Sequence, residues 1–109
     1  MLSRLEVIAF AGFLLLANVS RAEEQVVIVM KNTFFPTVSY VDVGDTVRFV
    51  NTAPGVQTIM ATDERWRIGP LNPGGEAVLT VVEGISQQFQ TSTGTEVGGR
   101  LSFAPGPNN

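Results

Sequence analysis

The sequence contains no cysteine and no histidine among its 109 residues. Without cysteine, no disulfide can support the fold, and the chain has neither a thiolate nucleophile nor a thiolate metal ligand. Without histidine, it lacks the side chain that most often acts as a general base near neutral pH. The serine and threonine hydroxyls therefore have no imidazole to activate them, and no pair of carboxylates stands out. We do not expect an enzyme.

Positive charge is also scarce, because seven Lys and Arg face ten Asp and Glu and the net charge is −3 at pH 7. Nucleic-acid-binding domains need a basic face, so DNA and RNA are not expected partners. The carboxylates do not follow a calcium-loop pattern and are interpreted as solvated charges. The Gly-Gly pairs at 74–75 and 98–99 do not open a helix with a Lys, as a phosphate loop requires, and are interpreted as turns.

The longest apolar run, residues 7–17, follows Arg4 and precedes the small-x-small sequence Ser20-Arg21-Ala22. This arrangement is typical of a secretory signal peptide, here residues 1–22, with cleavage after Ala22. The run is shorter than the roughly 20 apolar residues of a membrane span, and an uncleaved anchor is the alternative. We expect a domain of residues 23–109 in the periplasm or another extracytoplasmic space, with no membrane attachment after cleavage.

Short runs rich in Val, Ile and Phe alternate with Gly, Pro, Asn and Asp along the rest of the chain. No segment beyond residue 22 shows a helical period, and frequent strands between turn signals favour an antiparallel β-sandwich or barrel. Residues 62–75 hold two Pro and three Gly and are expected to be irregular. We expect strands at residues 25–30, 37–43, 46–51, 56–61, 76–82, 84–91 and 100–103.

Several short motifs follow one another in a recognisable order. They are Phe34-Phe35-Pro36, then Gly44-Asp45-Thr46-Val47 with Phe49 and Asn51, then Asp63, Trp66, Gly69, Leu71 and Pro73-Gly74, and finally Phe89, Gly99 and Leu101. Their order and spacing over residues 26–103 resemble the small blue-copper proteins, the cupredoxins of the plastocyanin, amicyanin and pseudoazurin type. The resemblance implies a cupredoxin-like, antiparallel Greek-key β-sandwich of about seven strands. The family's role is electron transfer.

The positions that match the family's copper ligands hold Gln57, Thr91, Gly94 and Val97 in place of two His, a Cys and a Met. A blue-copper centre needs two imidazoles, a thiolate and a weak axial thioether. An amide, a hydroxyl, a hydrogen and an isopropyl group cannot supply them, so we expect a degenerate copper site, no metal ligands and no cofactor. The remaining soft ligands, Met30 and Met60, lie in apolar runs and are expected to pack in the core.

We therefore expect a metal-free protein-binding or accessory module. In the family, redox partners dock at the loops around the ligands, and the matching surface here includes Pro54, Val56 and Val97 and could bind a periplasmic protein. Trp66 lies between two arginines and is either a partner anchor or a ring packed on the sandwich. The alternative function is copper-dependent electron transfer, as in the family, through an unconventional site or one completed by a partner's ligands.

Overall fold

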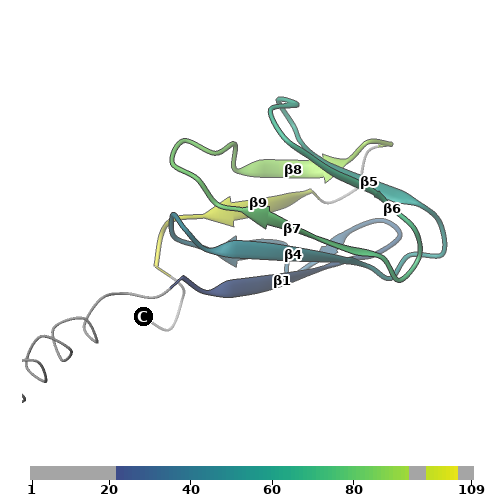
Figure 1. Ribbon diagram of the computed structural model, residues 1–109. Helices are drawn as coiled ribbons and strands as arrows, with labels where there is room; N and C mark the ends of the chain where they lie inside the picture. The colour runs from purple at the N-terminus through teal and green to yellow at the C-terminus, as the bar shows by residue number, and fades with distance from the viewer. Residues whose placement is uncertain (1–21, 94–97, 106–109) are drawn as a thin grey trace, which may run out of the picture.

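The computed structural model describes residues 22–93 and 98–105, which form nine strands in two facing sheets (Figure 1). The strands are β1 (Glu24–Val29), β2 (Phe34–Phe35), β3 (Val38–Tyr40), β4 (Thr46–Asn51), β5 (Gln57–Ala61), β6 (Arg67–Leu71), β7 (Glu76–Thr80), β8 (Gln88–Thr91) and β9 (Gly99–Ser102). The four-stranded sheet has the order β2-β1-β4-β7, and the five-stranded sheet has the order β3-β9-β8-β5-β6. The expected all-β, two-sheet fold is confirmed, and a closed barrel is not formed.

The predicted signal peptide lies outside the described residues except for Ala22, which precedes β1. Within residues 22–93 and 98–105, no helix is long and apolar enough to cross a membrane.

Both sheets are mixed, which corrects the expectation of purely antiparallel pairing. β1 runs parallel to β4 over six residue pairs, and β3 runs parallel to β9 over three. The other neighbouring pairs are antiparallel. Two of the nine strands, β2 and β6, were not expected.

The core consists of side chains that alternate along the strands and face the opposite sheet. Its centre is aromatic: the Phe89 ring lies 4.9 Å from the Phe34 ring and 5.4 Å from the Phe49 ring, both edge to face. Burying each of these rings contributes about 1.5–3 kcal/mol relative to leaving it exposed. Eleven buried residues make up this cluster, namely Val27, Val29, Phe34, Val41, Val47, Phe49, Ile59, Leu71, Val81, Phe89 and Leu101.

Gly99 makes room for the central ring. A methyl group in place of its hydrogen would overlap three carbons of the Phe89 ring, which is the residue paired with Gly99 across β8 and β9. The motif of Phe89 and Gly99 found in the sequence is therefore a packing requirement of the core.

Both methionines lie outside the core, so the expectation that they pack there is wrong. Met30 follows the buried Val29 and points outward, and its side chain is 42% exposed. Met60 stands between the buried residues Ile59 and Ala61 and is half-buried on the outer side of β5. The two-residue alternation of β5 places Ile59 and Ala61 inward and Met60 outward, and Met30 follows the inward-facing Val29 at the end of β1.

Candidate functional site

Four loops gather at one end of the sandwich, where β1, β4, β6 and β8 all finish (Figure 1). The last residues of β1 and β4, Val29 and Asn51, are partners across the sheet. The Gly74 amide donates to the Asn51 carbonyl at 2.6 Å, and the Ser92 amide donates to the Thr58 carbonyl at 2.9 Å. We call this surface the loop end, and its described loops are residues 30–33, 52–56, 72–75 and 92–93.

Asn51 fastens two of these loops from inside. Its side chain is fully buried, and its Nδ2 donates to the Gly55 carbonyl at 2.9 Å and to the Leu71 carbonyl at 2.8 Å. Its Oδ1 accepts from the Ala53 amide at 2.9 Å. The side-chain amide thus replaces the strand hydrogen bonds that the chain loses where it turns out of β4, and it fixes the path of residues 52–56.

The described part of the surface that Asn51 supports carries little charge and exposes several apolar side chains. Val56 is 57% exposed, and Pro54 beside it is also exposed. Among the described residues of the four loops, Lys31 is the sole charged side chain. Loops at the opposite end are rich in charge, with Asp42, Asp45, Asp63, Glu64, Arg65 and Glu83.

Two of the four positions that match copper ligands lie close together at the loop end. Thr91 ends β8 and is paired with Ile59 of the neighbouring strand β5. Gln57 precedes Ile59 by two residues, so it lies on the same side of β5 as Ile59. The predicted positions Gly94 and Val97 lie outside the described residues.

The groups at these two positions do not fit copper. The Thr91 hydroxyl is buried and lies 3.4 Å from the Thr93 hydroxyl, so its hydrogen-bonding partner is another neutral oxygen. A neutral hydroxyl and the carboxamide of Gln57 are hard oxygen donors, unlike the imidazole and thiolate that a blue-copper centre uses. In the described part of the chain, no three His, Cys, Asp or Glu side chains are grouped closely enough to hold a metal ion.

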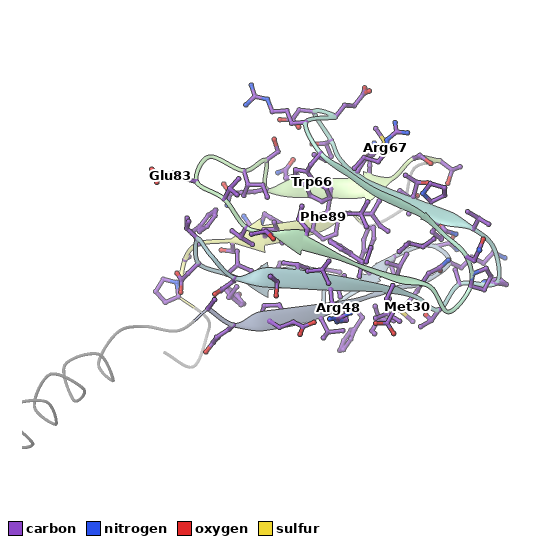
Figure 2. The ribbon with its side chains drawn as sticks, viewed as in Figure 1. Met30, Arg48, Trp66, Arg67, Glu83 and Phe89 are labelled. Atoms are coloured by element: carbon purple, nitrogen blue, oxygen red, sulfur yellow. The ribbon has the colours of Figure 1, made fainter. Side chains whose placement is uncertain are left out.

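Trp66 packs into the sandwich rather than standing free. Its ring lies 5.8 Å from the Phe89 ring and 6.2 Å from the Phe49 ring, and Figure 2 shows it beside Phe89 between the sheets. Its Nε1 donates to the Ser86 carbonyl at 2.9 Å. The side chain is half-buried, and its polar group is already bonded, which favours the packing interpretation over a partner anchor.

A second apolar surface covers the outer face of the four-stranded sheet. Val26 of β1, Met30 just after β1, Phe35 of β2 and Val78 of β7 are between 42% and 67% exposed there. The sequence held a signal for it, because residues 26–30 are apolar at every position, whereas a strand with one solvated face alternates. We did not predict this patch.

Arg48 crosses the same outer face and binds the carboxylates of Glu24 and Glu76 on the neighbouring strands (Figure 2). The hydrogen bond that Arg48 donates to Glu24, followed by the negative charge of Glu24, raises the pKa of Arg48 above its ordinary value. All three side chains are partly exposed, so these ion pairs contribute little to the stability of the fold.

A scan against known protein-family models finds no match, and neither does a search among curated proteins. The likeness to the blue-copper family therefore stands on the motifs in the sequence and on the two-sheet, all-β fold.

Proposed function

We propose that this chain is a cupredoxin-like Greek-key sandwich that has lost the copper site of that family and binds a partner protein through its loop end. It works after export, in the periplasm or an equivalent extracytoplasmic space. It is a binding or accessory module and not an enzyme.

The observation that supports this most directly is the contrast between the two ends of the sandwich. The described part of the loop end carries one charged side chain, exposes Pro54 and Val56 and is held by the buried Asn51 amide, whereas the opposite end is strongly charged. Protein interfaces are depleted of charge at their centre. A loop that is already fixed also loses little entropy when a partner covers it. The partner expected from this chemistry is an exported protein with a shallow apolar patch of its own.

Site-specific photo-crosslinking of the full-length, exported protein tests the surface. A photoreactive residue at Val56 is expected to give a discrete adduct in cells, and the Pro54→Asp substitution should abolish it. Val82 is the matched control, because it is 53% exposed but lies in the loop after β7, at the other end. Equal adducts from both positions, or no adduct from a correctly exported and folded Val56 variant, would refute the proposed docking surface.

Rebuilding the donor set tests the proposed ancestry. The quadruple variant Gln57→His, Thr91→Cys, Gly94→His and Val97→Met is expected to bind copper and to show the strong visible absorption of a thiolate–copper centre. The matched triple variant, which retains Thr91, should bind copper without that absorption. A folded quadruple variant that stays colourless in Cu(II) contradicts the placement of these positions.

The parent protein provides the test of metal loss. Purified from cells grown with copper, it should contain no stoichiometric copper and show no absorption in the visible range. Stoichiometric copper with such an absorption would favour the alternative function, electron transfer through an unconventional or partner-completed site.

A further inference from the structure

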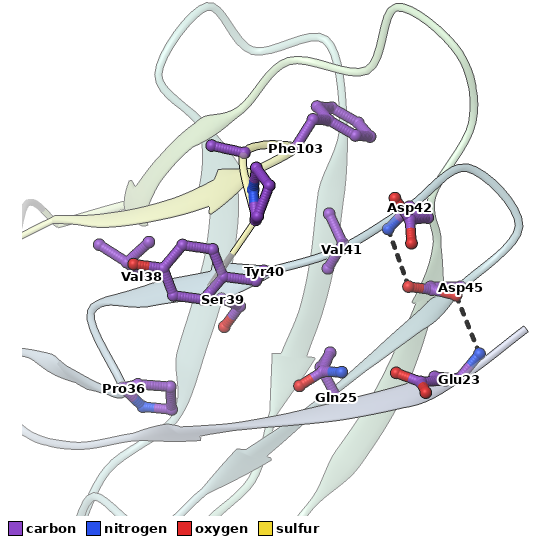
Figure 3. Close-up of a pocket in the computed structure, with 12 residues that line it drawn as sticks. Glu23, Gln25, Pro36, Val38, Ser39, Tyr40, Val41, Asp42, Asp45 and Phe103 are labelled. Carbon is purple, nitrogen blue, oxygen red and sulfur yellow. Dashed lines mark hydrogen bonds between the residues drawn. The ribbon is translucent and has the colours of Figure 1, made fainter. Parts of the chain in front are cut away.

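At the end of the sandwich opposite the loop end, a buried carboxylate holds the start of the first strand. Asp45 is 4% exposed, and its Oδ1 accepts from the main-chain nitrogen of Glu23 at 2.9 Å. Its Oδ2 accepts from the Asp42 amide at 2.8 Å, as the dashed lines in Figure 3 show. No Lys or Arg among the described residues forms an ion pair with Asp45. A buried carboxylate with two neutral donors and no cation is incompletely compensated.

The nitrogen that Asp45 holds belongs to the first residue after the predicted signal-peptide cleavage site. In the uncut chain it is an amide, but cleavage after Ala22 would convert it to an α-ammonium in the same place. We propose that the Ala22–Glu23 bond is the site of proteolytic maturation and that the new α-ammonium of Glu23 is bound by the Asp45 carboxylate. This inference rests on the export proposed above and adds a function for the cleaved end.

The main chain fixes both partners of this ion pair. The Glu23 carbonyl accepts from the Thr46 amide at 2.9 Å, which continues the parallel ladder of β1 and β4. The Asp45 carbonyl accepts from the Val81 amide at 2.8 Å, and the Asp45 amide donates to the Asp42 carbonyl at 3.0 Å. A chain that begins one residue earlier or later would therefore carry its ammonium away from the carboxylate.

The surroundings add to the preference for a cation. Asp45 lies in an open cavity of about 490 Å³ whose lining contains the carboxylates of Glu23 and Asp42 and no Lys or Arg (Figure 3). The nearest of these carboxylates, Asp45, lies 2.9 Å from the Glu23 nitrogen, where it would stabilise the protonated amine.

Cleavage therefore completes the fold in addition to releasing the chain. An α-ammonium donates a charge-assisted hydrogen bond, which is stronger than the amide bond that the uncut chain makes. Because the ion pair needs the protonated amine, this stabilisation is present at pH values where the amine carries its proton and is lost as the pH rises and the amine is deprotonated.

The experiment begins with the full chain, exported through its own leader. The intact mass of the purified protein is expected to correspond to a chain that starts at Glu23. Such a chain has two amines, the α-amine and the side chain of Lys31, the one lysine in the sequence. Competitive acetylation at pH 8, followed by mass spectrometry, then compares the α-amine with Lys31 as an internal reference.

In the parent, the α-amine should react several-fold more slowly, relative to Lys31, than in the Asp45→Asn variant, because only the unprotonated amine reacts and the ion pair favours the protonated form. Asp42→Asn is the matched control and should change the ratio much less, because the Asp42 carboxylate lines the cavity but does not accept the hydrogen bond from the Glu23 nitrogen. If Asp45→Asn does not fold, the parent in urea replaces it, and the ratio should rise several-fold on unfolding.

Equal ratios in the folded parent and in Asp45→Asn, or in native and unfolded parent, would overturn the ion pair and leave export intact. An exported chain cut at another bond would overturn the maturation site alone. An exported chain that is never cut would overturn this inference and favour the uncleaved anchor, whereas a chain that is not exported would overturn the proposed export as well.

Discussion

Replacing Asn51 with alanine tests whether one buried amide holds the loop end together. The substitution removes the three side-chain hydrogen bonds to Gly55, Leu71 and Ala53 but keeps the main-chain bonds that Asn51 makes to residues 74 and 75. The strand itself should therefore survive, and the loops should lose their inner support.

The magnitude follows from the groups that are left without a partner. Gly55 is exposed, so water can replace Asn51 at its carbonyl. The Ala53 amide and the Leu71 carbonyl belong to residues that are 3% and 7% exposed, and each buried group that loses its partner costs about 1–3 kcal/mol. The expected loss is about 2–6 kcal/mol, a large share of the 5–15 kcal/mol that stabilises a typical domain.

Urea unfolding followed by the fluorescence of Trp66, the single tryptophan, measures this loss. Asn72→Ala is the matched control: Asn72 is exposed in the neighbouring loop, where its main chain bonds Gly75, and its replacement should change stability by less than about 0.5 kcal/mol. Amide hydrogen exchange should also show that Ala53 loses more protection than the strands do. A loss below about 1 kcal/mol for Asn51→Ala, or unaltered exchange at Ala53, would refute the assigned role.

Three further substitutions test the packing and the charges. Gly99→Ala should cost about 1–3 kcal/mol or more, because the new methyl group overlaps the Phe89 ring, and an unchanged urea midpoint would contradict this packing. Trp66→Phe should lower the thermal midpoint moderately, as followed by circular dichroism, and Trp66→Ala should lower it severely, with a loss of about 3–5 kcal/mol in the free energy of unfolding. Similar midpoints for both variants would mean that the ring does not pack as described. The Ser86 hydroxyl donates to Asp63 at 2.6 Å and lowers the pKa of that carboxyl, so Ser86→Ala should raise it toward its ordinary value in an NMR titration. The stability linked to Asp63 is present above the ordinary pKa and lost as the pH falls through the lowered one, and an unshifted titration in Ser86→Ala would exclude this cause.

The sequence patterns predicted most strands but did not predict β6, because Gly69 and Pro70 interrupt it. β6 is an edge strand of the five-stranded sheet, where a proline need not donate to a ladder. Gly69 has a φ of +107°, and a Cβ there would lie 3.0 Å from the Gln57 carbonyl, at the point where the register of β5 and β6 shifts. The two residues that suggested an irregular segment are therefore the ones that let an edge strand bulge.

The outer apolar face was missed for a different reason. Residues 26–30 are apolar throughout, and we assigned Met30 to the core because a continuous apolar run is typical of a strand buried on both faces. In the structure only alternate residues, Val27 and Val29, are buried, and Val26 and Met30 remain 47% and 42% exposed. Periodicity identifies two faces of a strand, but whether another layer covers the second face depends on the whole arrangement of sheets.

Asn51 was visible in the sequence as part of a motif, yet the hydrogen bonds by which its side chain holds the loops could not be predicted. Its partners Gly55 and Leu71 lie 4 and 20 residues away, and the second contact depends on β6, which we had not expected. The structural role of a buried polar side chain depends on such distant partners and not on its neighbours in the sequence.

The buried Asn51 side chain links the stability of the scaffold to the proposed binding function. Fixing the backbone of one residue costs about 1–2 kcal/mol, so a loose loop of residues 52–56 would consume several kcal/mol of any binding energy. In this protein folding has already fixed that loop, and a partner that covers little more than Pro54 and Val56 need not order it again. Asn51 is fully buried and cannot touch the partner. Asn51→Ala is therefore expected to reduce crosslinking from Val56 in the fraction that still folds, whereas Asn72→Ala should leave it unchanged. Undiminished crosslinking from a loosened loop would mean that the partner recognises the apolar side chains without needing them held in place.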